Sequence, residues 1–251
     1  APVSAAAAQS QVAAAASWAP PGATSGQPSA GSMVVPGPAV TGDIGASADL
    51  PFQRFDRALA FMTLEMQRNS QIEWVVAGRE AAAMDCGFGW LSECADRQRA
   101  AWVDTLGPFV MLVQGGGYWD HKWRLNDLLA LGLDPDRPSL GDAYFPIRGN
   151  DDYEVRYDIW SNVHYGYIGS AAGLPAWQLF SGAFGAAVLS GGVEDAADSL
   201  SIRAGIRLWV AFGPNVNPGD VHAAILETMS AYELTNAQSG VLLPRGAGDW
   251  R

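Results

Sequence analysis

The sequence predicts a mostly α-helical domain with one small β-hairpin, preceded by a leader of low complexity. Apolar residues recur at steps of three and four along most of residues 51 to 251, which is the spacing of amphipathic helices. Hydrophobic residues make up 49% of the 251-residue chain, enough to build a buried core. Residues 1 to 50 are instead rich in Ala, Ser, Pro and Gly, and this composition buries too little surface to offset chain entropy. We therefore expect a flexible leader or linker over 1–50 and a folded helical domain over 51–251.

The first helix is predicted directly after the leader, where Asp49 suits a cap and Pro51 suits a first turn. Its apolar positions fall on one face: Phe52, Phe55, Leu59, Met62 and Met66. Further helices are expected at 71–84, at 96–113 (weakened by Gly107-Pro108), in a short segment after the triple glycine, and at 158–172, 175–189, 195–211 and 218–234. No period of 20 to 50 residues repeats, which excludes a solenoid.

The predicted β-hairpin lies between two helical regions. The fragments "AYFPIR" and "YEVRYD" alternate in hydrophobicity and are joined by the turn sequence "GNDD".

Charge and hydropathy limit the partners of the chain. The formal net charge is -11 and no cluster of Lys or Arg occurs, so nucleic acid is a less expected partner than peptidoglycan or another polymeric substrate, although a few basic residues in a cleft would still allow an acidic enzyme to cut RNA. No run of about eighteen apolar residues is present, so we expect no membrane span. The first residues lack the basic start of a signal peptide, and we expect a processed chain whose export signal has been removed.

The two cysteines, Cys86 and Cys94, lie in "DCGFGWLSEC". They can close a disulfide, which suits an exported protein, or remain reduced in a packed helical hairpin. Two Cys without nearby His pairs do not make a zinc site, and the sequence suggests no metal and no cofactor.

The stretch "GGGYWDHKWRL" places Asp120, His121 and Lys122 side by side, with Trp119 just before them. Glycines allow a backbone to approach a ligand closely, and a neighbouring carboxylate raises the proton affinity of a histidine. We interpret these residues as candidates for catalysis and substrate binding. The alternative is an exposed junction in which Asp120 caps the following helix.

The stretch "YDIWSNVHYGYIGSAAG" is the second candidate. In a helix, Asp158, Ser161, Asn162 and Tyr165 form one polar stripe, with His164 to the side of it. The glycines and alanines that follow predict close packing against another helix. The alternative is a buried helix whose polar groups satisfy one another.

Glu65 is the third candidate, because it stands between Leu64 and Met66 near the end of the first helix. An apolar surrounding would raise the pKa of its carboxyl and suit a general acid. A solvated helical Glu is the alternative. Nucleophile-elbow, phosphate-loop, zinc-peptidase and Rossmann motifs do not occur.

Four segments, in this order, resemble the bacterial polymorphic toxin type 44 domain: "FMTLEMQRNSQ", "VQGGGYWDHKWRL", "YDIWSNVHYGYIGSAAGL" and "EDAADSLSIRAGIRLW". The similarity spans about residues 61 to 209. The resemblance implies a mostly helical toxin module of an exported antibacterial protein, secreted or delivered to the periplasm of a target cell, often with an immunity protein as partner. The residues carried over by motif are Glu65, Asp120, His121, Lys122, Asp158, Asn162 and His164. Because the family often has Asn at the position of His164, Asp158 and Asn162 are the preferred pair.

The candidate residues support two kinds of hydrolase. In the favoured hypothesis the domain is a muramidase-like glycosidase of peptidoglycan, in which Glu65 or Asp120 protonates the glycosidic oxygen and Asp158 acts as base or stabilises charge. In the alternative it is a metal-independent ribonuclease with His121 and His164 as acid and base and Lys122 stabilising charge. A non-enzymatic binding module is a third hypothesis.

Overall fold

The computed structural model describes residues 52–86, 93–129, 131, 144–189, 196–234 and 242–245. The chain divides into two units at Leu50, and the first of them, with the predicted leader and the proposed cap Asp49, lies outside the described residues. Pro51 lies outside them as well.

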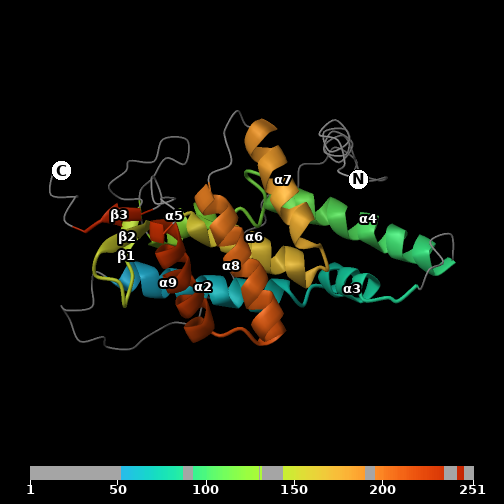
Figure 1. Cartoon of the computed structure of the whole chain (residues 1–251), viewed down its shortest axis with the longest axis horizontal. Coiled ribbons are helices and arrows are strands. Elements are labelled where there is room, and N and C mark those ends of the chain that lie inside the picture. The colour runs from blue at the N-terminus through green and yellow to red at the C-terminus, as the bar shows by residue number, and fades with distance from the viewer. Residues whose placement is uncertain are drawn as a thin grey trace. The chain divides into compact units, whose positions relative to one another are not determined.

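Eight α-helices account for most of the described residues, as Figure 1 shows. Their bounds are α2 Gln53–Asn69, α3 Glu73–Ala82, α4 Glu93–Val113, α5 Lys122–Leu129, α6 Ile159–Ala171, α7 Ala176–Leu189, α8 Ala196–Phe212 and α9 Pro218–Leu234. The 3₁₀ turn η2, Gly213–Asn215, joins α8 to α9. The predicted mostly helical fold is therefore confirmed. The helix expected at 96–113 is α4, which runs through Gly107 and Pro108.

The predicted hairpin is confirmed and belongs to a slightly larger sheet. β1 (Tyr144–Pro146) pairs antiparallel with β2 (Tyr153–Arg156), with Phe145 opposite Val155. A third strand that the sequence did not suggest, β3 (Leu242–Pro244), pairs antiparallel with the other edge of β2. The sheet lies at one end of the helical unit, beside α9 (Figure 1).

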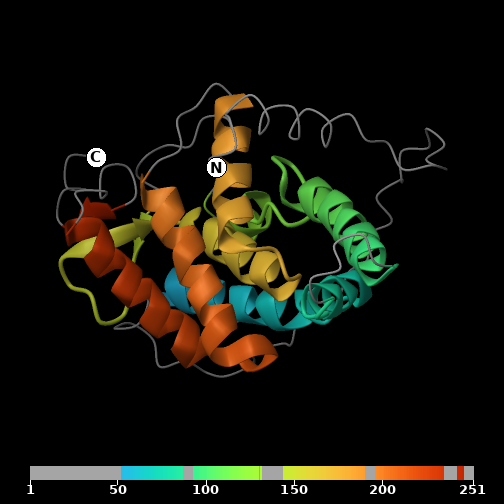
Figure 2. The same ribbon diagram turned by 45° about the vertical axis from the view of Figure 1, so that its right-hand side comes forward.

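Helix α6 forms the centre of the core. It contacts α2, α3, α7 and α8, and most of its side chains are buried. Figures 1 and 2 show α8 crossing α6 on one side while α2 passes on another. The close approach depends on Gly166 of α6 and Gly205 of α8, because a Cβ at either position would overlap the backbone of the opposite helix. The predicted packing by small residues in α6 is thus present.

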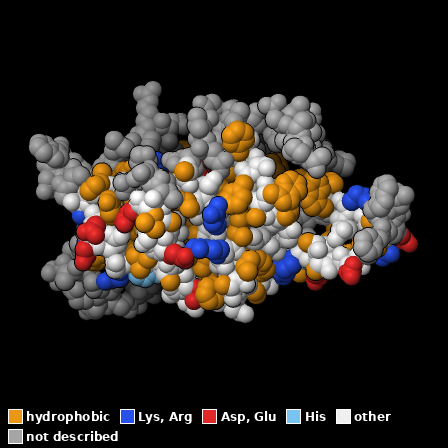
Figure 3. Space-filling view, viewed as in Figure 1, with side chains coloured by type: hydrophobic (Ala, Val, Ile, Leu, Met, Phe, Trp, Pro, Cys, Tyr) orange, Lys and Arg blue, Asp and Glu red, His pale blue; other side chains and the backbone are white. Residues whose placement is uncertain are grey.

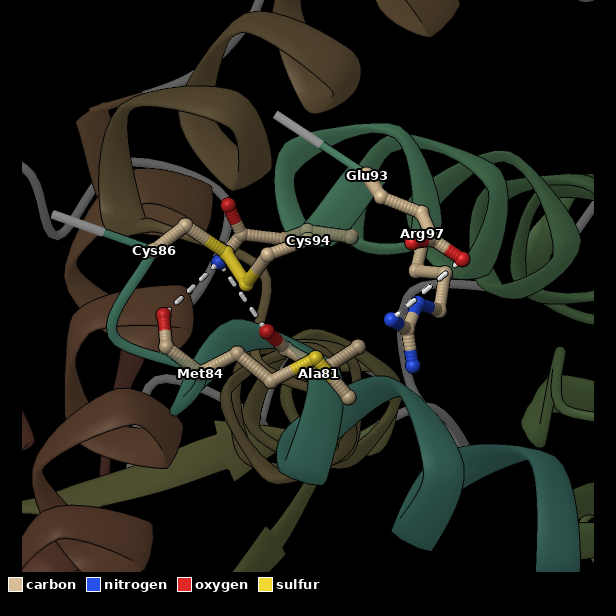
Figure 4. Close-up of a disulfide and its surroundings, with 7 residues drawn as sticks. Ala81, Met84, Cys86, Glu93, Cys94 and Arg97 are labelled. Atoms are coloured by element: carbon tan, nitrogen blue, oxygen red, sulfur yellow. Dashed lines mark hydrogen bonds and ion pairs between the residues drawn. A yellow bond between two sulfur atoms is a disulfide. The ribbon is translucent and has the colours of Figure 1, made fainter. Parts of the chain in front are cut away.

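A disulfide joins the α3 and α4 hairpin. Cys86 and Cys94 are bonded, with their Cα atoms 5.6 Å apart, which settles the alternative that the sequence left open. Figure 4 shows the bond beside the carbonyl groups of Ala81 and Met84, which accept hydrogen bonds from the Gln98 amide at 3.0 and 3.3 Å. The hairpin is therefore held by a covalent bond and by polar contacts close to it.

Candidate functional site

A buried carboxylate, Glu65, lies at the centre of a polar cluster formed by α2, α5 and α6. Its side chain is 6% exposed. Arg124 of α5 donates two hydrogen bonds to it, from Nη1 to Oε2 at 2.7 Å and from Nη2 to Oε1 at 3.2 Å. His121, just before α5, contacts Oε2 through Nε2 at 3.2 Å. The start of α5 thus brings one imidazole and one guanidinium onto the same carboxylate.

The pKa of Glu65 contradicts the expectation from the sequence. Burial alone raises this pKa, but the hydrogen bonds from His121 and Arg124 outweigh the effect and hold it well below the ordinary value of 4.5. The prediction of a raised pKa was therefore wrong, because the apolar neighbours Leu64 and Met66 do not determine the surroundings of the carboxyl. Glu65 is ionised near neutral pH and can only accept hydrogen bonds, so the Nε2 atom of His121 carries a proton.

His164 of α6 lies against the same cluster and is fully buried. The Nδ2 atom of Asn69 is 3.1 Å from Nε2 of His164 and 3.3 Å from Oε2 of Glu65. Since an amide nitrogen only donates, Nε2 of His164 accepts, and the proton of the neutral ring is on Nδ1. Burial holds the pKa of His164 well below 6.5, and the nearby His121 ring adds to the effect, so the His164 ring is neutral near pH 7.

The two imidazoles leave two complementary atoms unsatisfied. Their ring centroids lie 4.3 Å apart at an angle of 65°, and Nδ1 of each ring is buried without a hydrogen-bond partner. In neutral rings with the protons placed as above, Nδ1 of His121 is an acceptor and Nδ1 of His164 is a donor. Nδ1 of His121 is therefore able to take a proton from a hydroxyl group, and Nδ1 of His164 is able to donate a hydrogen bond. These are the properties of a general base and of a positioning donor.

The solvent side of the cluster is formed by Arg124 and aromatic rings. The Arg124 guanidinium lies over the rings of Phe61 and Tyr118, at 4.8 and 4.9 Å from their centroids. Its side chain is 32% exposed, whereas both imidazoles are fully buried. Arg68, which is 60% exposed, also approaches Glu65, with Nη1 4.0 Å from Oε1. Arg124 therefore occupies the boundary between solvent and the Glu65–His121 pair.

A second polar cluster contains the residues that the sequence favoured. Asp158 is paired with Arg156, with 2.6 Å between Oδ2 and Nη2, and Asn162 donates to Asp198 at 2.7 Å. Burial and the charge of Asp158 raise the pKa of Tyr157, and the charge of Asp120 raises it further. Asp120 and Asp158 therefore both lie within electrostatic range of Tyr157, while Glu65 and Asp158 have separate partners.

The remaining candidates have varied surroundings. Asp120 does not cap α5 but accepts a hydrogen bond from the Gly116 N–H at 3.0 Å. Lys122 is exposed, and the Tyr165 hydroxyl donates to the Leu179 carbonyl at 2.9 Å. Trp119 is buried and packs on His164, with centroids 5.6 Å apart, so it presents no open ring to a substrate.

Sequence reasoning brought Glu65, His121 and His164 into the candidate list but missed Arg124 and Asn69. Asn69 could have been found from its spacing, since it lies one helical turn after Glu65. Arg124 has no such local signal, because it comes from a different helix, 59 residues along the chain from Glu65.

The described residues define a helical domain with a buried carboxylate, imidazole and guanidinium cluster. Residues 108–210 match the model of a protein family described as bacterial toxin 44. The match confirms the resemblance over this part of the chain and supports a role as a toxin. It includes His121, Arg124 and His164, whereas Glu65 and Asn69 precede it. No curated protein and no solved structure gives a significant match to the chain.

Two features are absent from the described residues. None of the helices in this part of the chain is long and apolar enough to cross a membrane. Within the same residues, no group of three or more His, Cys, Asp or Glu side chains is arranged to hold a metal ion.

Proposed function

We propose that the domain is a toxin ribonuclease that uses general acid–base chemistry, with His121 as the base. The observation that carries the proposal is the pair of buried, unpartnered Nδ1 atoms on two imidazoles 4.3 Å apart, beside an ionised Glu65. A glycosidase acid must be protonated near neutral pH, and a carboxyl with a lowered pKa does not meet that condition. Imidazoles that flank a hydroxyl group fit phosphodiester cleavage better.

In the proposed reaction, Nδ1 of His121 removes the proton from a ribose 2′ hydroxyl group. The 2′ oxygen forms a bond to the adjacent phosphorus, and the bond from phosphorus to the 5′ oxygen breaks. The leaving oxygen takes a proton from solvent, and His121 later releases its own proton to solvent. The products are a 2′,3′-cyclic phosphate and a 5′ hydroxyl group, so atoms and charge balance.

Each neighbour of His121 has a defined part in this proposal. Glu65 accepts the Nε2 proton of His121, which fixes the ring orientation and stabilises the imidazolium that forms. His164, being neutral, acts as a positioning donor rather than as the acid. Arg124, and Lys122 at the start of the same helix, supply positive charge for the phosphorane-like transition state. Because both imidazoles are buried, we propose that Arg124 moves aside when substrate binds.

The test is to incubate the purified protein separately with total RNA, single-stranded DNA of similar length and purified peptidoglycan sacculi. The expected result is RNA cleavage that leaves 2′,3′-cyclic phosphate ends, with DNA and sacculi intact. Cleavage of DNA at a comparable rate would refute the role of the 2′ hydroxyl group. Soluble muropeptides with intact RNA would replace the proposal with the second candidate.

The second candidate is a peptidoglycan glycosidase that uses Asp120 and Asp158. It is supported by the electrostatic effect of both carboxylates on the single side chain of Tyr157. Exposed aromatic residues that could stack on sugars add support, and Figure 3 shows hydrophobic side chains gathered around α7 on one face. The exposed aromatic residues include Trp102 of α4 and Trp177 and Phe184 of α7. Against it, the Asp158 carboxylate is already paired with Arg156.

We also propose that the protein is secreted, or delivered to a competing cell, and is neutralised in its own cell by an immunity protein. The family match supports delivery, and the Cys86–Cys94 disulfide suits passage through an oxidising compartment. Expression of the domain in the cytoplasm of a sensitive host tests where its target lies. Growth arrest without any export signal would support a cytoplasmic target such as RNA.

A further inference from the structure

We infer that Arg68, Arg124 and Tyr118 form a binding subsite for one nucleotide of a single-stranded substrate, with the two guanidinium groups on its phosphate and the ring on its base. This inference rests on the proposed ribonuclease function and names how the substrate is held at the same site. Its first basis is an imbalance of charge at Glu65. Two guanidinium groups approach the Oε1 atom of this one carboxylate, Arg124 at 3.2 Å and Arg68 at 4.0 Å.

The excess positive charge faces solvent. Glu65 is 6% exposed, whereas the side chains of Arg68 and Arg124 are 60% and 32% exposed. Arg124 directs Nη1 and Nη2 toward Glu65, and a guanidinium has five N–H donors, so further donors remain for a ligand. Arg68 has only a long contact to the carboxylate, and its side chain is able to turn toward a phosphate. In a chain of net charge -11, this is a local site at which an anion is attracted.

The ring of Tyr118 gives the subsite its second part. It is 55% exposed and lies directly beside the anion-binding groups, since the Arg124 guanidinium is 4.9 Å from its centroid. A ring held in place by a cation stacks well on a nucleobase, and such stacking tolerates any base. An exposed aromatic ring next to two guanidinium groups therefore fits a phosphate joined to a base more closely than it fits an uncharged glycan.

The carboxylates of the surrounding elements do not neutralise the positive charge of Arg68 and Arg124. On the loop before α5, Asp120 accepts a hydrogen bond from the Gly116 backbone. On α5 itself, Asp127 lies one turn after Arg124 and is exposed to solvent. On α2, the nearest other carboxylate in sequence is Asp56, which is paired with Arg148 at 2.8 Å.

The subsite also connects recognition to catalysis. When a phosphate takes donors of Arg124, the guanidinium is drawn from the Glu65–His121 pair that it covers. Substrate binding would then uncover the contact between Glu65 and His121 that orients the imidazole ring.

The test measures binding separately from cleavage. A fluorescent single-stranded DNA pentanucleotide serves as the probe, because it lacks the 2′ hydroxyl group and is not cut by the proposed reaction. Binding is followed by anisotropy for wild type, Arg68→Gln and Tyr118→Ala. The control is Arg97→Gln, which removes a similarly exposed guanidinium that is paired with Glu93 on α4.

We expect Kd to rise at least about fivefold for Arg68→Gln and for Tyr118→Ala, and to stay within twofold of wild type for Arg97→Gln. The slope of log Kd against the logarithm of the salt concentration should decrease by about 0.7 for Arg68→Gln, because one phosphate contact on a single strand is lost. Equal Kd values for Arg68→Gln and Arg97→Gln would overturn the subsite, as would tighter binding of a soluble muropeptide than of the pentanucleotide.

The two proposals fail in different ways. If RNA is not cut but the pentanucleotide binds with the expected dependence on Arg68, the subsite stands and the ribonuclease proposal fails. If RNA is cut and the KM of Arg68→Gln and Tyr118→Ala equals that of wild type, the ribonuclease proposal stands and the subsite fails.

Discussion

Replacing Glu65 with Gln tests whether its buried carboxylate is ionised. The substitution preserves the shape of the side chain and removes only the charge that Arg124 and His121 contact. If the account of the site is correct, the variant loses stability at neutral pH because the Arg124 guanidinium loses its counter-ion.

The size of the loss follows from the burial of the two partners. Removing one partner of a fully buried ion pair costs about 3–5 kcal/mol, and an exposed pair contributes about 0–1 kcal/mol. Glu65 is buried but Arg124 is 32% exposed, so solvent compensates part of the lost pair. We therefore expect the free energy of unfolding to fall by about 2–3 kcal/mol at pH 7.

The pH dependence of this difference in stability shows whether the pKa of Glu65 is lowered or raised in the folded state. A carboxyl whose pKa is lower in the folded state stabilises the fold above its ordinary value, here 4.5, and the contribution is lost as the pH falls toward the folded value. Urea unfolding followed by circular dichroism, at intervals between pH 7 and pH 3, measures the difference between wild type and Glu65→Gln. It should be constant from pH 7 to about pH 5.5 and shrink below pH 4.5.

A raised pKa would give the opposite trend. A carboxyl that is protonated in the folded state stabilises the fold more as the pH falls, so the advantage of wild type over Glu65→Gln would grow toward pH 4. That result would refute the ionised carboxylate and restore Glu65 as a candidate general acid.

Three further changes test the packing, the disulfide and the second polar cluster. Gly205→Ala should destabilise the fold by about 3 kcal/mol or more, because its Cβ meets the backbone of α6 rather than a side chain that can move; urea unfolding checks this, and a loss below about 1 kcal/mol would contradict the close helix contact. Replacing Cys86 and Cys94 by Ser should lower the free energy of unfolding by about 2–3 kcal/mol through the lost loop constraint, and reduction of wild type should give the same shift. Asp158→Asn should lower the melting temperature by weakening the pair with Arg156 while leaving RNA cleavage within about threefold of wild type; abolished activity with an unchanged melting temperature would instead support a catalytic Asp158.

The helices could be predicted because local patterns determine them. The spacing of apolar residues predicts the apolar face of α2, which includes Phe55, Met62 and Met66. These side chains are buried as expected. The small residues of α6 likewise indicated a close helix contact. The partner position, Gly205, could not be assigned from spacing alone, because it lies on a helix from another part of the chain.

The site was less predictable because its contacts are long-range. The polar stripe indicated a shared wall, but its side chains have separate partners. Asp158 pairs with Arg156, two residues before it, whereas Asn162 donates to Asp198 of α8 and the Tyr165 hydroxyl to the Leu179 carbonyl of α7. The position of Glu65 between apolar neighbours suggested a raised pKa, and the contact with Arg124, 59 residues away, reverses it.

His121 is the proposed base in RNA cleavage. This role is tested by the initial rate of RNA cleavage by wild type, His121→Asn and His222→Asn, each checked for folding by circular dichroism. His222 is the matched control, a half-buried histidine of α9 whose Nε2 atom is 2.7 Å from the Arg148 carbonyl. We expect His121→Asn to lower the rate at least about 100-fold and His222→Asn to stay within about threefold of wild type. Equal rates for folded wild type and His121→Asn would contradict this role.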